Sequence, residues 1–225
     1  MAKKETNATP ELENVELVLS KSEQFIEKYQ KQLLIGLGVV LAIVLAIMAF
    51  QNFYLKRRVT DAQNAMYKAE QYFAIDSFKV ALNGDGSSDM MGFKEVADEY
   101  SITPSGKLAT AYTGICYFKL GDYQNAVKFL TQYEGKDDFF KTSVLGLTGD
   151  AYAEIGDADK ANDFYKKAIG MKNELTPVYL KKAGILQETK GKTEDALKMY
   201  QQIKDEYPTS MQAGDIDKYI ARVQK

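Results

Sequence analysis

The sequence predicts an all-α protein in which an N-terminal transmembrane helix is followed by an α-solenoid of helical hairpins and a C-terminal capping helix. Three observations support this fold class. Residues 33–50 form an uninterrupted apolar run, columns of small residues recur every 35 positions in the second half of the chain, and the C-terminal residues carry one amphipathic helical pattern. Together they predict a membrane-tethered array of helix pairs in one polypeptide.

The composition excludes several classes of function before any motif is considered. The chain has no His and a single Cys, Cys116, so it lacks the commonest general base and cannot form an internal disulfide or a multi-cysteine zinc site. Its 29 Lys and Arg against 31 Asp and Glu give a formal charge of −2, which indicates no general affinity for a phosphate backbone. We therefore expect no enzymatic activity, no cofactor, no metal, and no nucleic-acid or small-molecule ligand.

Residues 1–32 are predicted to form a polar N-terminal segment that contains an amphipathic helix. Apolar residues recur on one stripe among many charges, which is typical of a helix that lies at a surface and leads into a membrane. These residues are Leu12, Val15, Leu19, Ile26 and Tyr29. Because so long a polar segment precedes the apolar run, the run does not have the form of a cleaved signal peptide. We expect it to remain in the protein as a signal anchor.

Residues 33–54 are predicted to be a single transmembrane span. From Leu33 to Phe50 no side chain is charged or strongly polar, and as a helix this run would extend about 27 Å, close to the hydrocarbon thickness of a bilayer. Its Leu, Ile, Val and Phe residues favour insertion by roughly 4 to 7 kcal/mol. The alternative is a core helix, which would need protein on every side. The sequence therefore favours the membrane.

One face of this span consists of small residues. Gly38, Ala42 and Ala46 lie four residues apart, a spacing that lets a second membrane helix approach closely, although small residues are also common in such helices for no specific reason. Basic residues flank both ends of the span, so the positive-inside rule does not orient it. The sequence thus predicts a candidate helix-packing face and leaves the membrane orientation open.

Residues 55–106 are predicted to join the span to the solenoid through a long linker helix and a degenerate first repeat or cap. Residues 57–82 have the pattern of one long helix, and a loop containing Gly and Ser then precedes a short helix that ends near Pro104. The apolar positions of the long helix are Ala65, Ala69, Tyr72, Phe73 and Phe78.

Residues 107–225 contain a repeat with a period of 35 residues and end in a capping helix. The units span residues 107–141, 142–176 and 177–211. The columns that share the period are Gly114, Gly149 and Gly184; Gly121, Gly156 and Gly191; and Ala126, Ala161 and Ala196. The capping helix carries Ile216, Tyr219, Ile220 and Val223 on one face.

Each column has a mechanical interpretation. The glycines at 121, 156 and 191 would end the first helix of a unit in the left-handed conformation, and the second helix would start at Asp122, Asp157 and Thr193. We expect the earlier glycine column to face the alanine column, small residue against small residue, so that the two helices of a unit pack closely. Each helix pair would then depend on its neighbour for a core.

These columns resemble the tetratricopeptide repeat. The second unit shows the pattern most fully, at Leu145, Gly149, Tyr152, Gly156, Ala161, Tyr165 and Ala168. Departures are Thr113 and Thr148 at a position that is usually Leu, and one extra residue in each period. The resemblance implies a scaffold that binds proteins or peptides in a groove lined by set positions of the first helices. The groove candidates are Leu108, Ile115, Phe118, Lys119, Asp150, Glu154, Lys181, Ile185 and Glu188, whose alternative role is packing or solvation.

The order of one anchor and then repeats is similar to the bacterial ancillary subunit of the protein-export translocon. That resemblance implies a single-pass protein of the plasma (inner) membrane, with a cytoplasmic N-terminus and a periplasmic or other extracytoplasmic repeat domain that associates with the translocon and periplasmic chaperones. Two alternatives stay open: an organelle import receptor with a cytosolic repeat domain, and a regulatory subunit of a membrane enzyme. An enzyme would need a convergent polar site, and the sequence shows none.

Overall fold

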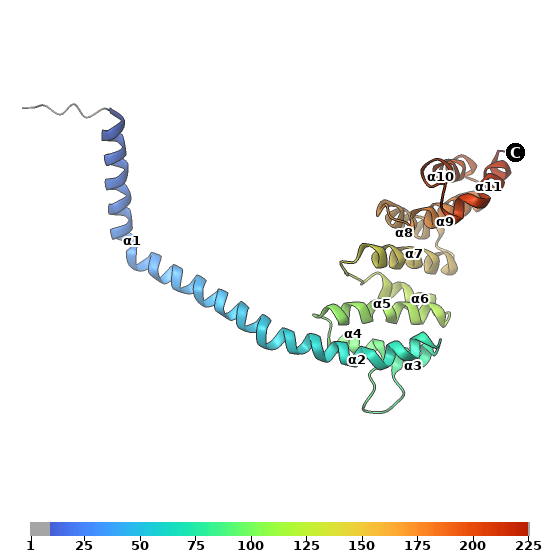
Figure 1. The fold of residues 1–225 in the computed structure, drawn as a ribbon, viewed down its shortest axis with the longest axis horizontal. Helices are drawn as coiled ribbons and strands as arrows, with labels where there is room; N and C mark the ends of the chain where they lie inside the picture. Colours follow the sequence, from blue (N-terminus) through green and yellow to red (C-terminus); the bar gives the residue numbers. More distant parts are fainter. Residues whose placement is uncertain (1–9, 225) are drawn as a thin grey trace, which may run out of the picture. The chain divides into compact units, whose positions relative to one another are not determined.

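A computed structural model describes residues 10–224, with the side chains of residues 10–24 and 27 outside that description. Within this range every regular element is a helix. The chain divides into two compact units, the first ending at Lys56 and the second beginning at Arg57. Figure 1 shows the helices of the second unit following one another as a stack.

The first unit consists of α1 (Pro10–Ala49) and the π-helix η1 (Phe50–Leu55). Every side chain of the apolar run is exposed. Among the described residues one helix is long and apolar enough to cross a membrane by length and composition, and its most apolar window has a mean hydropathy of 3.0 with 0% of it buried. A core helix of a soluble domain would be covered by protein, and this one is not. The predicted N-terminal stripe lies outside the described side chains at Leu12, Val15 and Leu19.

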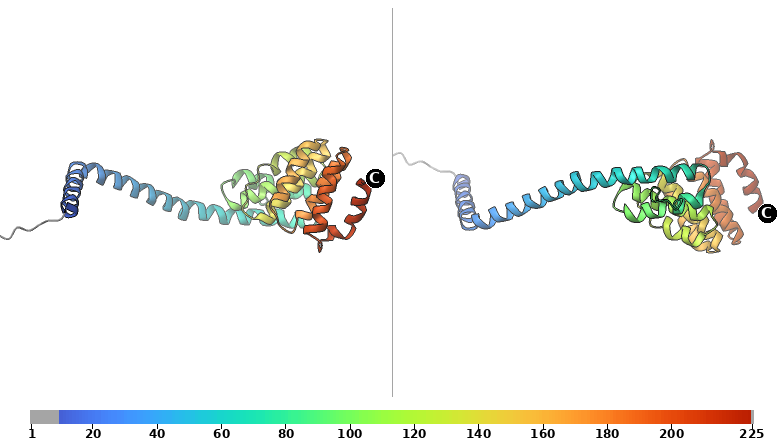
Figure 2. Two further views of the ribbon diagram at one scale, coloured as in Figure 1. Left: turned by 90° about the horizontal axis from the view of Figure 1, so that it is seen from above. Right: turned by 90° about the horizontal axis from the view of Figure 1, so that it is seen from below.

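The second unit is built from helix pairs whose elements are short and regular. Figure 2 shows α11, in red, at the end of the stack. In chain order the elements are α2 (Lys56–Ala74), α3 (Phe78–Asn83), α4 (Phe93–Glu99), α5 (Pro104–Lys119), α6 (Tyr123–Leu130), α7 (Asp138–Ile155), α8 (Ala158–Gly170), α9 (Thr176–Thr189), α10 (Thr193–Glu206), η2 (Met211–Asp215) and α11 (Ile216–Val223).

The three turns between paired helices share one backbone geometry. Gly121, Gly156 and Gly191 have φ of +79°, +89° and +72°, the left-handed region predicted for them. Each glycine N–H donates to the carbonyl three residues back at 2.9–3.1 Å, and the next N–H donates to the carbonyl five residues back at 2.9 Å. This is the Schellman pattern, which satisfies the last carbonyls of the first helix.

The helix that follows each turn starts where predicted, and in two of three cases an aspartate side chain caps it. The carboxylates of Asp122 and Asp157 accept hydrogen bonds from N–H groups of the first turn, at 3.1 Å each. α10 begins at Thr193 as predicted, but Lys192 occupies the capping position and makes no side-chain cap. The third unit therefore starts its second helix without this stabilising hydrogen bond.

The region upstream of the repeats is a hairpin, and the prediction of one long helix over residues 57–82 is wrong. Asp76 has φ of +58° and interrupts the helix. Its N–H donates to Phe73 O at 3.1 Å, and the next N–H donates to Tyr72 O at 2.9 Å, which repeats the bonding of the glycine turns. Since Asp replaces Gly at this left-handed position, no glycine marks the turn in the sequence. Asp76 precedes Gly121 by 45 residues, so each position of α2 corresponds to the position of α5 that lies 45 residues later.

A loop splits the second half of this first hairpin. It runs from Gly84 to Gly92, between α3 and α4, and protrudes from the stack in Figure 1. Its two ends touch, because a Cβ added at Gly92 would lie 2.4 Å from the backbone nitrogen of Gly84. Both α3 and α4 contact α5, so the two short helices together cover the first helix of the next pair.

The glycines inside the first helices face large side chains, and at Gly149 the backbone oxygen of Ala161 comes next, 3.1 Å from an added Cβ, so the expectation of small residues alone is incomplete. A Cβ at Gly184 would lie 2.4 Å from Cε1 of Tyr200, and equivalent contacts of 2.6–2.7 Å join Gly149 to Tyr165 and Gly114 to Leu130. The alanine column lies one helical turn earlier on the second helix and is buried beside these contacts. A large side chain lying across a glycine fills the space between the helices at native density.

Buried residues form four successive clusters along the stack, and each cluster draws residues from more than one helix pair. The rings of Tyr165 on α8 and Tyr179 on α9 stack with centroids 6.4 Å apart. Gly146 on α7 leaves the room that Tyr179 occupies, since a Cβ there would lie 1.8 Å from its Cε1. Neighbouring pairs therefore complete one another's core, as stacked repeats require.

Replacing Gly184 by Ala should lower the stability of the protein. Alanine in an exposed helix interior is favoured over glycine by about 1 kcal/mol, but here its Cβ collides with the fully buried ring of Tyr200. We expect Gly184→Ala to reduce the free energy of unfolding by roughly 1 to 3 kcal/mol, as overpacking does. The measurement is urea unfolding followed by circular dichroism. The matched control is Gly170→Ala, where nothing lies within 4 Å of the added Cβ; equal midpoints for the two variants would contradict the packing described.

Candidate functional site

The predicted groove residues lie on three successive first helices, and we call this surface the first-helix face. Leu108, Ile115, Phe118 and Lys119 lie on α5, Asp150 and Glu154 on α7, and Lys181, Ile185 and Glu188 on α9. All nine are half-buried or exposed, so each can reach solvent or a partner. These residues differ in whether they already form hydrogen bonds, ion pairs or ring contacts with other residues of the chain.

The α5 part of the first-helix face is apolar. Ile115 and Phe118 pack on the edge of the second core cluster and remain half-buried, and Leu108 packs likewise on the first cluster. The ring of Phe118 meets Tyr123 edge-on with centroids 5.3 Å apart. The exposed ammonium of Lys119 lies 5.9 Å from the ring centre of Phe78. This part offers apolar area beside one cation.

Asp150 is engaged inside the protein. Its carboxylate accepts a hydrogen bond from Tyr165 OH at 2.8 Å and two from Lys182 Nζ at 2.8 and 2.6 Å. Asp150 lies on α7, Tyr165 on α8 and Lys182 on α9, so these hydrogen bonds connect two helix pairs. Burial raises the pKa of Tyr165, and the Asp150 charge raises it further, so its hydroxyl stays a donor. Asp150 is therefore a structural residue on this surface.

Lys181 and Glu188 both hold the C-terminal cap. Lys181 Nζ donates to Asp215 at 2.6 Å and lies 4.4 Å from the ring centre of Tyr219. Glu188 accepts from the guanidinium of Arg222 at 2.5 and 2.7 Å, and from Tyr200 OH at 3.0 Å. The Arg222 hydrogen bond, opposed by partial burial, lowers the pKa of Glu188. These contacts anchor η2 and α11 to α9.

The partners of these charges were not predicted from the sequence. They are Lys182, Asp215 and Arg222. A signal for them exists, because each pair joins opposite charges 32 or 34 positions apart, close to the 35-residue period that places residues on adjacent first helices. Opposite charges one repeat apart are therefore candidates for pairing with each other rather than with a ligand.

Glu154 and Ile185 remain available on the first-helix face. Glu154 is exposed, and within the described residues no hydrogen bond or ion pair engages it. Ile185 is 38% exposed, unusual for a large aliphatic side chain in a packed repeat. The predicted small-residue face of α1, at Gly38, Ala42 and Ala46, is also exposed, and nothing lies within 4 Å of a Cβ built at Gly38.

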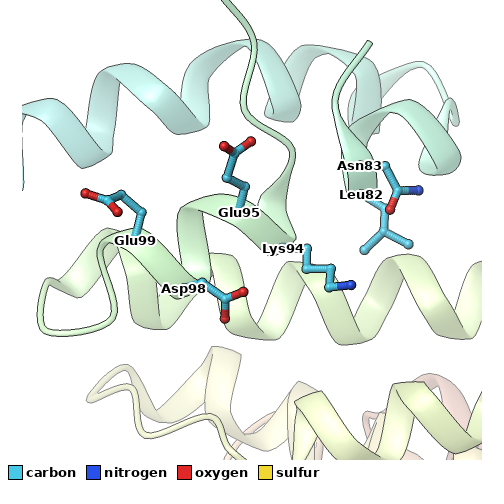
Figure 3. Close-up of a pocket in the computed structure, with 6 residues that line it drawn as sticks. All are labelled: Leu82, Asn83, Lys94, Glu95, Asp98 and Glu99. Atoms are coloured by element: carbon cyan, nitrogen blue, oxygen red, sulfur yellow. The ribbon is translucent and has the colours of Figure 1, made fainter. Parts of the chain in front are cut away.

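A surface pocket of about 400 Å³ lies between the end of α3 and α4. Its lining residues are Leu82, Asn83, Lys94, Glu95, Asp98 and Glu99. Figure 3 shows that the three carboxylates point in different directions and do not converge. Glu99 is paired with Arg58 at 2.7 Å. Across the described residues no group of His, Cys, Asp and Glu is arranged to hold a metal ion.

Comparison with known proteins identifies the repeat unit. The family profile described as "Tetratricopeptide repeat" matches residues 112–136, 143–175 and 178–210. The fold is similar to a crystal structure of Podosopora anserina putative kinesin light chain TPR-like repeats, with a TM-score of 0.55, 13% identity, and coverage of 73% of this chain and 85% of that chain. It is also similar to a crystal structure of MamA protein, with a TM-score of 0.52, 15% identity, and coverage of 75% of this chain and 87% of that chain. At such identities the likeness shows the fold alone. A comparison with curated protein sequences gave no match.

Cys116 should be unreactive in the folded protein. It is buried, and burial raises the pKa of its thiol to about 12, so almost no thiolate forms near neutral pH. We expect iodoacetamide at pH 8 to alkylate it about a thousandfold more slowly in the native state than in urea. Mass spectrometry of timed samples measures both rates. Similar rates in the two states would show that Cys116 is accessible.

Replacing Glu188 by Gln should loosen the C-terminal cap. Arg222 loses its carboxylate partner, so amide hydrogen exchange across α11 should accelerate at neutral pH. The matched control is Lys198→Gln, which removes a 3.8 Å pair with Asp195 on the surface of α10. Unchanged exchange in Glu188→Gln would contradict the anchoring role.

The same variant has a defined pH dependence. Because the folded state lowers the pKa of Glu188, its carboxylate stabilises the fold above the ordinary pKa of a glutamate and loses that effect as the pH falls through the lowered value. The difference in melting temperature between parent and Glu188→Gln should therefore be largest near neutral pH and shrink in acid. A difference that grows in acid would contradict this assignment.

Proposed function

We propose that this chain, which carries tetratricopeptide repeats, is a membrane-anchored scaffold that binds protein or peptide partners through its first-helix face. The observation that carries the proposal is the combination of an uncovered apolar helix with a repeat face on which Ile115 and Phe118 remain accessible. Stacked repeats present extended surfaces of this kind for polypeptide ligands. The anchor would raise the local concentration of the partner at the membrane.

The anchor is supported by length, composition and exposure. The described helix from Lys28 contains the most apolar stretch of the chain and none of that window is buried. Aromatic side chains stand at both ends of the stretch, with Tyr29 before it and Phe53 and Tyr54 after it, where interfacial rings are enriched. We propose a single span, with the N-terminus cytoplasmic and the repeat domain extracytoplasmic at the plasma (inner) membrane. The similarity in element order to ancillary translocon subunits supports this orientation and a role in protein export or chaperone networks.

A non-enzymatic role agrees with the chemistry on the surface. Asp150, Lys181 and Glu188 are joined to other residues of this chain, and the thiol of Cys116 has a pKa of about 12. The carboxylates around the α4 pocket diverge (Figure 3). These groups offer neither a paired acid and base nor an activated nucleophile.

Anchoring predicts how the chain fractionates. In membranes treated with alkaline carbonate, the full chain should stay in the pellet and be released by detergent, since its span is held by the hydrophobic effect. A variant that begins at Arg57 is the control and should be released without detergent. Recovery of the full chain in the carbonate supernatant would contradict the anchor.

Orientation can be tested in the same membranes. A reporter fused after Lys225 should be protected from added protease in intact cells and digested after the outer envelope is opened. Digestion only after the plasma membrane itself is broken would place the repeats in the cytosol, as in an organelle import receptor.

Docking on the first-helix face predicts that Phe118→Ala reduces the recovery of crosslinked partners severalfold. Loss of the ring removes apolar contact area without touching the ion pairs of α7, α9 and α11. The matched control is Phe164→Ala, which truncates a half-buried aromatic residue of the second helix α8 whose ring stacks on Tyr152 of α7. Equal recovery for both variants, with equal helicity, would contradict docking on this face.

A further inference from the structure

The first-helix face has two halves with different electrostatic states. Towards the C-terminus, Asp150, Lys181 and Glu188 are neutralised by residues of this chain. Lys119 on α5 and Glu154 near the end of α7 carry no such ion pair within the described residues. A ligand would have to break internal ion pairs to use the C-terminal half, and removing one partner of such a pair is costly. Charge recognition is therefore left to the N-terminal half.

The turn at Asp76 adds α2 to this half of the surface. Because Asp76 takes the place of Gly121 with an offset of 45 residues, Glu70 corresponds to Ile115, and Phe73 corresponds to Phe118. The first helix of the upstream hairpin thus continues the predicted groove positions. We use "open half" for the surface made by Glu70, Phe73, Ile115, Phe118, Lys119 and Glu154.

Glu70 is a carboxylate on α2, one helical turn before the aromatic residue Phe73. It is half-buried, and within the described residues no hydrogen bond or ion pair engages it. Partial burial raises the pKa of Glu70, and burial followed by the Glu70 charge raises the pKa of Tyr112. Tyr112 lies 5.0 Å from Phe73 between ring centroids. A partly desolvated carboxylate beside aromatic rings favours a guanidinium or ammonium group.

Across the three successive first helices of the open half, an acidic residue is followed by apolar residues and then by a second acidic residue. Glu70 lies on α2, Ile115 and Phe118 on α5, and the exposed Glu154 on α7. Lys119 is the one cation among the residues of the open half, so the open half carries a formal charge of −1. Taking about 10 Å between the axes of neighbouring helices, we expect carboxylates on α2 and α7, with α5 between them, to stand roughly 20 Å apart. An extended peptide covers that span with about six residues.

Resting on the proposed function, we propose that the open half takes an extended polypeptide segment in which an apolar centre is flanked by basic residues about six positions apart. The apolar centre lies over Ile115 and Phe118. The flanking basic side chains pair with Glu70 and Glu154. Since both carboxylates are at the solvent boundary, the charge contribution weakens as salt rises.

The test uses the full chain in detergent micelles and three fluorescein-labelled synthetic peptides of about eight residues. The first has leucine and phenylalanine at its centre and an arginine near each end, the second replaces both arginines by glutamates, and the third replaces the apolar centre by serines. Fluorescence anisotropy at low and physiological salt measures their affinities. We expect the first peptide to bind at least about tenfold more tightly than the others, with an advantage over the second that shrinks at higher salt.

Protein variants then locate the binding. Glu70→Gln with Glu154→Gln should reduce affinity for the first peptide about tenfold, whereas the control Asp163→Asn with Glu194→Gln, on exposed positions of the second helices, should leave it unchanged. If the first two peptides bind equally and Phe118→Ala weakens both, the basic specificity is wrong and the docking face stands. If no peptide binds, or if Phe118→Ala changes nothing, the docking face itself is wrong and this inference falls with it.

Discussion

The structure of the repeat region depends on one close contact, the passage of a large side chain of the second helix across a glycine of the first. At Gly184 the ring of Tyr200 occupies the volume that any Cβ would need, and the same relation recurs at Gly149 with Tyr165. This contact brings the paired helices together and leaves the other side of each first helix uncovered. The neighbouring pair then covers part of that side, as Tyr179 does at Gly146. A stack with an accessible first-helix face is the geometric consequence.

The charges on that face have mainly a structural role towards its C-terminal end. Glu188 and Lys181 hold the capping elements, so the cap depends on the same residues that a groove prediction assigns to a ligand. Capping of the last repeat requires such contacts, because an exposed terminal pair would leave its apolar side in water. The accessible remainder combines apolar side chains with the carboxylates of Glu70 and Glu154, and it is the surface on which we propose that a polypeptide docks.

Much of the repeat region could be predicted from the sequence, because a glycine forced into the left-handed region and a capping aspartate leave residue-specific marks. Gly156 and Asp157 show both. The first turn escaped prediction since Asp76 adopts the left-handed conformation without glycine. The shared period of the glycine and alanine columns predicts their spacing, but it does not predict that a large side chain, such as Tyr165 at Gly149, also lies against the glycine.

The site was less predictable than the fold for the same reason. The period correctly places Asp150 and Glu188 on accessible first helices, but whether a charge is free depends on pairing in space, which only the contacts with Lys182 and Arg222 reveal. The apolar helix is predicted from composition alone, and the structure adds that 0% of its most apolar window is buried.

The most direct measurement is site-specific photocrosslinking in native membranes, with a photoreactive residue at Ile115 on the first-helix face or at Lys166 on the second-helix side. The account predicts discrete crosslinked protein adducts from Ile115 in the carbonate-resistant membrane fraction, suppressed by Phe118→Ala, and none of them from Lys166. The same adducts from both positions, or adducts from Ile115 that are found only in the soluble fraction, would contradict it.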